Sequence, residues 1–237
     1  MSRFFFVDEL PDLGEKSWQP PLELARHIRA LRISIGSEVV LLPQIGGGVV
    51  AQLLENGNLF VKSQANRPEI DLPDISLASA WPKGSRGDDL IRRATELGAL
   101  RIVPLTCERS VTGKNDLSSS KVSRWHKISK EVCQQCRRPD LPIIDGDLMS
   151  LKQLATEFKN HQLICLSPSA LPLQQTLANN SKPILLIVGP EGGLSTDEEN
   201  LLKQHGAVLA SIGPTILRIE AAGPSAIAIA SHCLQSK

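Results

Sequence analysis

The chain has 237 residues, of which 41% are hydrophobic and 22% charged, as expected for one large or two modest globular domains. Its 26 lysine and arginine residues against 25 acidic residues leave a net charge of +1, so overall charge does not indicate a nucleic-acid partner. No stretch approaches the about 18 apolar residues of a membrane-spanning helix, and the apolar start is too short for a secretory signal. Five scattered cysteines do not suggest a disulfide framework, so the sequence favours a reduced, cytoplasmic protein.

The first segment, residues 1–73, is predicted to be a small β-rich barrel. Glycines at 46–48 and the sequence at 55–58 indicate turns between short apolar runs, and Pro20-Pro21 favours the start of a helix over 21–31. The proline-containing stretch 66–74 is the best candidate for a linker. The apolar runs that we expect to form strands are residues 4–7, 38–42, 49–54 and 59–61.

After residue 73, predicted strands and helices alternate, which is typical of a mainly parallel α/β sheet. The sequence from Ser195 to Glu198 has the form of a capping box that starts a helix, and Gly206 is expected to end it. The predicted strands are residues 75–81, 101–105, 163–166, 184–188 and 208–212. The other predicted helices are residues 88–97, 121–138 and 222–234.

The nearly neutral total conceals a basic stretch from Pro82 to Arg138. This stretch holds 13 lysine and arginine residues against six acidic residues, a local balance of +7. In the predicted helix 121–138 the basic residues lie opposite an apolar stripe of Val122, Trp125, Ile128, Val132 and Cys136. Segregated positive charge either binds a phosphate backbone or forms a solvated helix face, and charge alone does not decide between the two.

Three predicted strands end in loops that are suited to binding a ligand. The loop Gly189-Pro190-Glu191-Gly192-Gly193 lets a ligand approach the backbone closely, although it fits neither the phosphate-binding nor the dinucleotide-binding glycine pattern. The other two loops follow Leu166 and Ile212. Because neighbouring parallel strands end at the same edge of a sheet, we expect the three loops to converge on one site. A plain tight turn is the alternative for each loop taken alone.

The remaining chemical candidates are few. Arg218 and Glu220 stand among apolar residues, where they either form a structural ion pair or line a site. Cys133 and Cys136 have the spacing of metal ligands but lack a second pair, so no metal site is expected. The sequence has no nucleophile elbow and no Ser-His-Asp arrangement.

Four ordered motifs carry a resemblance that spans nearly the whole chain. They are residues 92–110, residues 124–138 with Pro142, residues 189–193 and residues 216–221, and the segments 3–5 and 27–32 match as well. These motifs resemble the RsmE family, ribosomal RNA uridine N3-methyltransferases of the SPOUT superfamily. Two positions depart from the family pattern, because Thr215 stands in place of the usual arginine and Ala221 in place of the usual threonine.

The resemblance implies a fold, a cofactor and partners. The expected fold is α/β, with a PUA-like RNA-binding β-barrel over residues 1–73 and a SPOUT domain with a deep trefoil knot over residues 74–237. The family implies S-adenosylmethionine as cofactor, a homodimer, and small-subunit ribosomal RNA or the assembled subunit as substrate. The residues that it assigns to the cofactor are Leu166, Ser167, Val188, Gly189, Glu191, Gly192, Gly193, Ile212, Gly213, Ile216 and Leu217.

The implied reaction is methylation of uracil N3, which requires loss of the N3 proton and an unpaired or flipped base. Arg138, Arg218 and Glu220 are the candidates for the acceptor site, with arginine stabilising negative charge on the uracil oxygens. One alternative is another SPOUT enzyme that methylates a ribose 2′-oxygen or a guanine, and the other is a non-catalytic RNA-binding assembly factor. The expected RNA contacts are Arg3, Arg29, Arg32, Lys83, Arg86, Arg109 and Arg124.

Overall fold

The computed structural model describes residues 3–110 and 117–235. Lys114 and Asp116, which belong to the basic stretch counted above, lie outside the described residues. The chain divides into two compact units, one of residues 1–70 and 133–141 and the other of residues 71–132 and 142–237. The first unit thus includes a stretch from the middle of the chain, which nothing in the local sequence indicated. Within the described ranges, no helix is long and apolar enough to cross a membrane.

The first unit is built on a four-stranded sheet with the order β1-β2-β3-β4. Strand β1 pairs parallel to β2, and the other neighbours are antiparallel. Within the described part of the chain β1 and β4 are the edges of this sheet, so strand pairing does not close it into a barrel. The elements are β1 (Arg3–Phe6), α1 (Leu22–Ala30), β2 (Glu38–Leu42), β3 (Gly48–Leu53) and β4 (Leu59–Ala65).

The core of the first unit lies between this sheet and α1. Alternate strand residues such as Phe5, Leu41 and Leu59 are almost completely buried, together with Leu24 and Ile28 of the helix. Each side chain buried in this way stabilises the fold by about 1.5–3 kcal/mol relative to exposure. The alternating apolar pattern that predicted the strands therefore selects which face packs on the helix.

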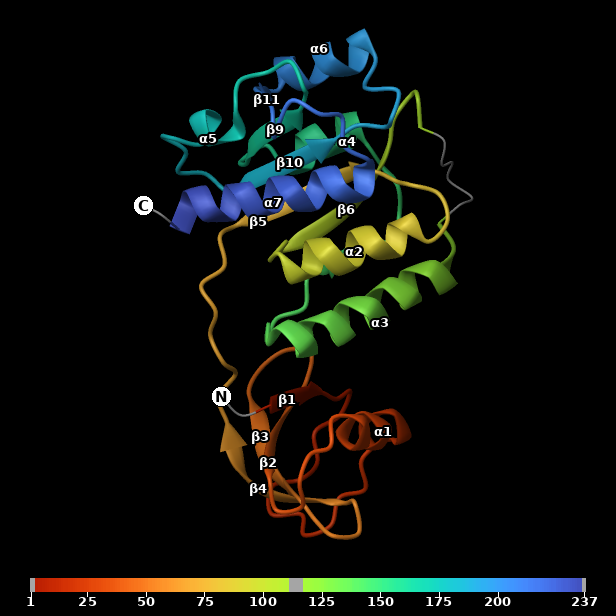
Figure 1. Ribbon diagram of the computed structural model, residues 1–237, viewed down its shortest axis with the longest axis vertical. Helices are drawn as coiled ribbons and strands as arrows, with labels where there is room; N and C mark the ends of the chain where they lie inside the picture. Colours follow the sequence, from red (N-terminus) through yellow and green to blue (C-terminus); the bar gives the residue numbers. More distant parts are fainter. Residues whose placement is uncertain (1–2, 111–116, 236–237) are drawn as a thin grey trace. The chain divides into compact units, whose positions relative to one another are not determined.

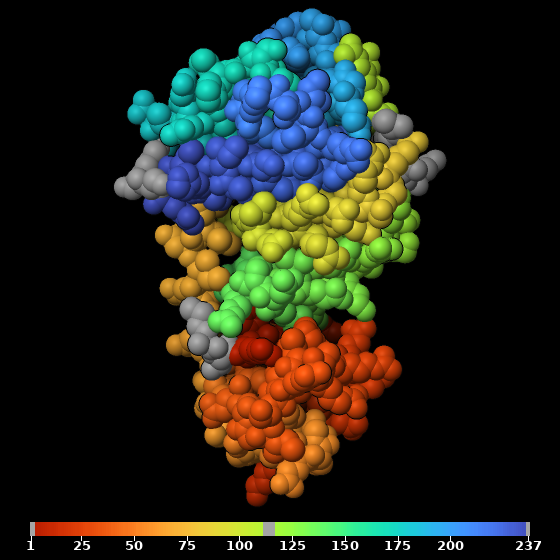
Figure 2. Space-filling view, in the orientation of Figure 1, coloured from red at the N-terminus to blue at the C-terminus, as the bar shows by residue number. Residues whose placement is uncertain are grey.

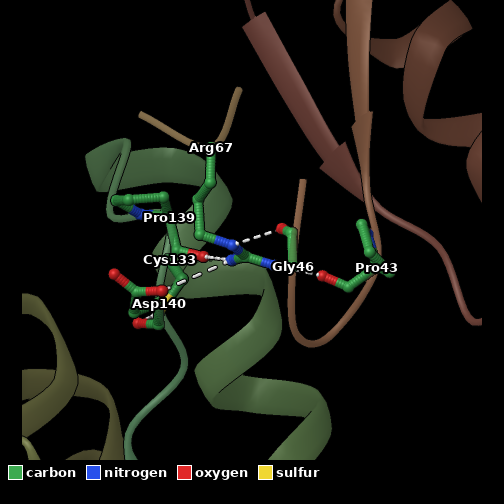
Figure 3. Close-up of polar contacts among 6 residues, drawn as sticks. All are labelled: Pro43, Gly46, Arg67, Cys133, Pro139 and Asp140. Atoms are coloured by element: carbon green, nitrogen blue, oxygen red, sulfur yellow. Dashed lines mark hydrogen bonds and ion pairs between the residues drawn. The ribbon is translucent and has the colours of Figure 1, made fainter. Parts of the chain in front are cut away.

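Arg67, which follows β4, fastens two separate segments of the first unit (Figure 3). Its Nε donates to the carbonyl oxygen of Gly46 at 2.9 Å, and its Nη2 donates to that of Pro43 at 2.6 Å. Its Nη1 donates to the carbonyl oxygen of Pro139 and lies 3.4 Å from a carboxylate oxygen of Asp140. One guanidinium thus satisfies backbone acceptors of the β2–β3 loop and of the stretch contributed by residues 133–141.

The second unit holds a seven-stranded parallel sheet with the order β11-β9-β10-β5-β6-β7, in which β8 also pairs with β6. Every residue of β5 and β10 is buried, as expected for central strands that are covered on both faces. Two short strands were not predicted. The strands are β5 (Ile75–Ala80), β6 (Arg101–Thr106), β7 (Ile143–Ile144), β8 (Met149–Ser150), β9 (Gln162–Leu166), β10 (Ile184–Val188) and β11 (Val208–Ala210).

Helices α2 (Arg86–Glu96) and α7 (Ile219–Gln235) lie side by side across one face of this sheet, and α7 contacts β5 and β10. In the space-filling view they form adjoining yellow and blue bands (Figure 2). Gly223 makes the close packing possible, because a Cβ there would lie 2.9 Å from a methyl group of Leu77. The remaining helices are α3 (Ser119–Cys136), α4 (Leu151–Glu157), α5 (Leu173–Thr176) and α6 (Thr196–Gln204).

The apolar stripe of α3 differs from the predicted one at its C-terminal end. Trp125, Ile128 and Val132 are buried as expected, but Cys136 is exposed, and Cys133 is buried in a separate cluster with Phe4, Phe6 and Leu42. The helix ends at Cys136, so this last residue lies where the chain leaves the helix and turns away from the packed face. The prediction of Cys136 as a core residue was therefore wrong.

Candidate functional site

Three strand-end loops of the second unit line one cavity of about 350 Å³. Strands β9, β10 and β11 are neighbours in the sheet, and the loops that follow them meet beyond their carboxyl ends. The structure therefore brings together every residue that the resemblance assigned to the cofactor. These lining residues are Leu166, Ser167, Val188, Gly189, Glu191, Gly192, Gly193, Ile212, Gly213, Ile216 and Leu217.

The glycine-rich loop after β10 contains a tight turn. The amide of Gly193 donates to the carbonyl oxygen of Pro190 at 2.8 Å, which closes a tight turn. Gly193 has φ +71, a conformation that favours glycine, and a Cβ there would meet no atom within 4 Å. Open space therefore lies directly beside the backbone of this loop, so a ligand can contact its N–H and C=O groups.

The loop after β11 is held by local hydrogen bonds. The amide of Gly213 donates to the Ser211 hydroxyl at 3.2 Å, and that hydroxyl donates back to the carbonyl oxygen of Gly213 at 3.1 Å. The Ser167 amide, in the loop after β9, donates to the carbonyl oxygen of Ala210 at 2.9 Å. These bonds tie two of the three loops together at the cavity wall.

A turn that follows β6 braces the glycine-rich loop from outside the cavity. The Arg109 guanidinium donates to the carbonyl oxygens of Gly192 and Leu194, at 2.9 and 3.4 Å. The Glu198 carboxylate accepts from the amide of Glu108 with one oxygen and from the amide of Ser195 with the other, each at 2.8 Å. The Ser195 hydroxyl in turn accepts from the Glu198 amide, and these two bonds between Ser195 and Glu198 form a capping box at the start of α6. The predicted capping box is thereby confirmed.

The cysteines near this site are poor nucleophiles. Burial raises the pKa of Cys165, which lines the cavity, to about 12. Burial, with the charge of Glu198 as a second cause, raises the pKa of Cys107 to about 12. Both side chains are therefore neutral thiols at physiological pH, and the cavity offers no thiolate for covalent catalysis.

The three acceptor-site candidates do not all lie in the same unit. Arg218 and Glu220 flank the start of α7 in the second unit, next to the cavity residues Leu217 and Ile219. Arg138 belongs to the first unit, where it is only 3% exposed and where burial lowers its pKa. Within the described residues Arg218 and Glu220 form no ion pair with each other, and Oε2 of Glu220 is buried with no hydrogen-bond partner. The structure thus shows neither alternative, because the two residues form no ion pair with each other and neither lines the cavity.

Several of the expected RNA contacts already have partners within the chain. Arg86 pairs with Glu191 at 3.1 Å, Arg124 pairs with Asp88 at 2.6 Å, and Arg109 binds the backbone as described above. Lys83 is exposed. In the first unit, Arg3 and Arg32 line a shallow hollow, and Arg29 donates back to the carbonyl oxygen of Ala25 in its own helix.

Sequence reasoning missed part of the cavity lining. Thr215, where the sequence departs from the family pattern, lines the cavity, whereas the second departure, Ala221, does not. A charged residue, Glu199 of α6, also lines it, and only its place next to the capping box could have indicated this. Other lining residues that were not assigned to the cofactor are Cys165, Pro168, Pro190, Leu194, Leu209, Ile219 and Ala222. In the part of the chain that the structure describes, no group of three or more potential ligands is arranged to hold a metal ion.

Comparisons with known proteins agree on one family. A model of an RNA methyltransferase domain family matches residues 69–231. The ribosomal RNA small subunit methyltransferase E of Synechocystis is 32% identical over 217 residues, covering 88% of this chain and 70% of the relative. The protein of the same name from Rickettsia conorii is 31% identical over 219 residues, covering 86% of this chain and 85% of the relative.

Solved structures share the fold over nearly the whole chain. A methyltransferase of Legionella pneumophila in complex with S-adenosylmethionine has a TM-score of 0.78 at 25% identity, over 98% of each chain. The ribosomal RNA small subunit methyltransferase E of Neisseria gonorrhoeae has a TM-score of 0.78 at 24% identity, over 97% of this chain and 96% of that chain. The α/β fold expected from the sequence is thereby confirmed.

Proposed function

Since this chain belongs to the ribosomal RNA small subunit methyltransferase E family, we propose that it methylates N3 of one uridine in small-subunit ribosomal RNA. The protein is an S-adenosylmethionine-dependent methyltransferase of ribosomal RNA. The assignment of uracil N3 as the acceptor atom rests on the four family motifs in the sequence. The single observation that supports an enzymatic function is the cavity formed by the three strand-end loops.

The cavity fits the cofactor. Glycines leave backbone groups accessible at Gly193 and Gly213, where a Cβ would meet no atom within 4 Å, and apolar residues such as Val188 and Leu217 form much of the remaining wall. We assign the cofactor to the residues that converge there from β9, β10 and β11. Bound S-adenosylmethionine supplies a methyl group that is already activated by a sulfonium centre, so the protein must mainly place and deprotonate the acceptor.

Residues at the start of α7 are suited to handling the acceptor. Within the described residues, the buried Oε2 of Glu220 has no hydrogen-bond partner, which leaves it able to accept the N3 proton of a uracil base that reaches it, and the exposed Arg218 is two residues away. We propose that Glu220 orients or receives this proton, and that Arg218 stabilises the negative charge that develops on the uracil oxygens. The N3 edge takes part in base pairing, so the uridine must be unpaired or flipped before it is methylated. Arg138 is proposed for the acceptor site as well, and this assignment rests on the family motif alone.

The larger architecture of the family is proposed for this chain as well. We propose a PUA-like RNA-binding barrel over residues 1–73 and a knotted methyltransferase domain over residues 74–237, supported by the β-rich first unit and by the parallel sheet of the second. We also propose a cytoplasmic homodimer that acts on ribosomal RNA or on the assembled small subunit. Of the expected RNA contacts, Arg3, Arg29, Arg32, Lys83, Arg86 and Arg124 would position the phosphate backbone.

The test of the proposed function has two steps. Calorimetric titration of the purified protein with S-adenosylmethionine should give saturable binding, and failure to bind would reject the cofactor site. Unmethylated small-subunit RNA, or the subunit itself, is then incubated with protein and cofactor, and its nucleosides are separated by mass spectrometry. We expect 3-methyluridine, whereas a 2′-O-methylated nucleoside or a methylated guanosine would reject N3 as the acceptor.

The acceptor-site assignment is tested by Glu220→Gln, Arg218→Ala and Arg138→Ala. Each variant should lose at least about a hundredfold in turnover, as when one charge-stabilising or proton-accepting group is removed, with unchanged cofactor affinity. Because Arg138 is buried, circular dichroism must first show that its variant is folded. Turnover at the wild-type rate in a folded variant would remove that residue from the mechanism.

A further inference from the structure

The turn from Cys107 to Ser110, which follows β6, contributes no residue to the cavity but contacts the loop that lines it. The turn is itself closed by two hydrogen bonds. The Ser110 amide donates to the carbonyl oxygen of Cys107 at 3.0 Å, and the Cys107 amide donates to the Ser110 hydroxyl at 3.0 Å. Because these two bonds close the turn, Glu108 and Arg109 are held in a defined position for their contacts with the glycine-rich loop and α6.

Two side chains link this turn to the cavity wall in opposite directions. Arg109 reaches from the turn to the carbonyl oxygens of Gly192 and Leu194. Glu198 reaches from α6 to the turn and accepts from the Glu108 amide at 2.8 Å. The side chain of Arg109 also lies beside Gly192, because a Cβ on this glycine would be in van der Waals contact with its Cδ at 3.5 Å.

The carboxylate of Glu198 accepts hydrogen bonds from both α6 and the turn. One oxygen completes the capping box of α6 with the Ser195 amide, and the other holds the turn. The glycine-rich loop is therefore fixed at Gly192 and Leu194 by Arg109, and at its end by the helix that Glu198 starts. The Arg86–Glu191 pair adds a third contact, but both side chains are about 40% exposed or more, so this pair contributes little.

We propose that Arg109 and Glu198 are positioning residues that hold the glycine-rich loop in its cofactor-binding conformation. This inference rests on the proposed function, because it takes the cavity as the S-adenosylmethionine site. It replaces the sequence-based expectation that Arg109 contacts RNA with a role inside the protein. A loop with three glycines in five residues has many accessible conformations, so contacts that select one of them raise cofactor affinity without touching the cofactor.

The deciding experiment compares Arg109→Ala with Arg92→Ala, which removes an exposed arginine of α2 that lies on the same basic stretch. Calorimetry should show that Arg109→Ala raises the Kd for S-adenosylmethionine about tenfold, the loss expected for one charge-assisted hydrogen bond, while Arg92→Ala leaves it unchanged. Arg109→Lys keeps one donor and should recover part of the affinity. Glu198→Gln keeps the capping box but can accept from only one of the two amides, so it should raise the Kd as well.

RNA binding separates this role from a phosphate contact. Without cofactor, the affinity of Arg109→Ala for small-subunit RNA and its salt dependence should equal those of the wild type. Weaker RNA binding with a shallower salt slope, and an unchanged cofactor Kd, would overturn the proposal.

Hydrogen exchange of the cofactor-free protein measures how firmly the loop is held, so it tests the positioning role without relying on the proposed function. In Arg109→Ala, amides from Gly192 to Ser195 should exchange faster while those of β10 are unchanged. Identical exchange in the variant and the wild type would reject the positioning role, even if the wild type failed to bind S-adenosylmethionine.

Discussion

Arg32 and Arg137 adopt a left-handed backbone conformation, with φ of 51° and 61°. Among the described residues they are the only non-glycine residues with positive φ. Each follows a helix and closes it, since the Ile33 amide donates to the carbonyl oxygen of Ile28 and the Arg138 amide to that of Cys133. This helix end normally uses glycine, because a side chain in the left-handed region costs about 1–2 kcal/mol.

Replacing either arginine with glycine should therefore stabilise the first unit. We expect Arg32→Gly and Arg137→Gly each to raise the free energy of unfolding by about 0.5–1 kcal/mol, measured by hydrogen exchange of amides in β2 and β3. Arg26→Gly is the matched control, and it should lower stability by about 1 kcal/mol because its site is a helix interior. A loss of stability at residues 32 and 137 would show that their side chains make stabilising contacts that exceed the backbone cost.

The burial of individual cysteines predicts which thiols an alkylating reagent modifies in the native protein. Burial raises the pKa of Cys107, Cys133 and Cys165 to about 12 each, whereas Cys136 is exposed. Iodoacetamide at pH 8 should therefore modify Cys136 in the native protein and the three buried thiols only after denaturation. Peptide mass spectrometry gives the order of modification. Early alkylation of Cys165 would mean that the cavity opens to solvent more widely than its walls indicate.

At the scale of elements, Arg67 is one of the attachments of the stretch 133–141 to the first unit, beside the packing of Cys133 against Phe4, Phe6 and Leu42. Three carbonyl oxygens accept from this guanidinium, whose side chain is only 16% exposed. We expect Arg67→Ala to lower the exchange-derived stability of β2 and β3 by about 2 kcal/mol, because it leaves those acceptors without a donor. Arg26→Ala, at an exposed site of α1, should stay within about 0.5 kcal/mol of the wild type. Equal stability of the two variants would contradict the anchoring role.

Elements differ in how far their sequences define them. The apolar runs of β5 and β10 and the capping box of α6 are strong local signals, and the structure confirms all three. Helix α4 was missed although Ser150 and Gln153 form a capping box in front of it, a signal that sequence analysis could have used. Strands β7 and β8 have two residues each, which is too short for any periodicity to be detected.

The site residues also differ in whether their positions could be predicted from the sequence. Those lining the cavity follow buried strands, so their common edge could be predicted from the sequence. The partners of Arg109 could not, because they lie 83 and 85 residues away and a charge count does not distinguish an internal hydrogen bond from a phosphate contact. The burial of Arg138 could not be predicted from the sequence either, because it depends on the placement of residues 133–141 in the first unit.

For the whole molecule, binding of the cofactor should protect one unit selectively. S-adenosylmethionine at a hundred times its Kd should stabilise the unit that holds the cavity by about 2.7 kcal/mol. Hydrogen exchange should slow at residues 166–168, 189–195 and 211–217, and it should not change in β1 to β4. Protection in the first unit alone would place the cofactor outside the cavity.

The position of the cavity residues along the chain has a consequence for protein synthesis. Its walls are translated in the order of β9, β10 and β11, and the last lining residue is Ala222. Strand β11 is added at the edge of the sheet beside β9, after the central strands are already available. On the proposed assignment, a growing chain thus has no complete cofactor site until residue 222 has left the ribosome, so an unfinished copy lacks part of the wall that would hold the methyl donor.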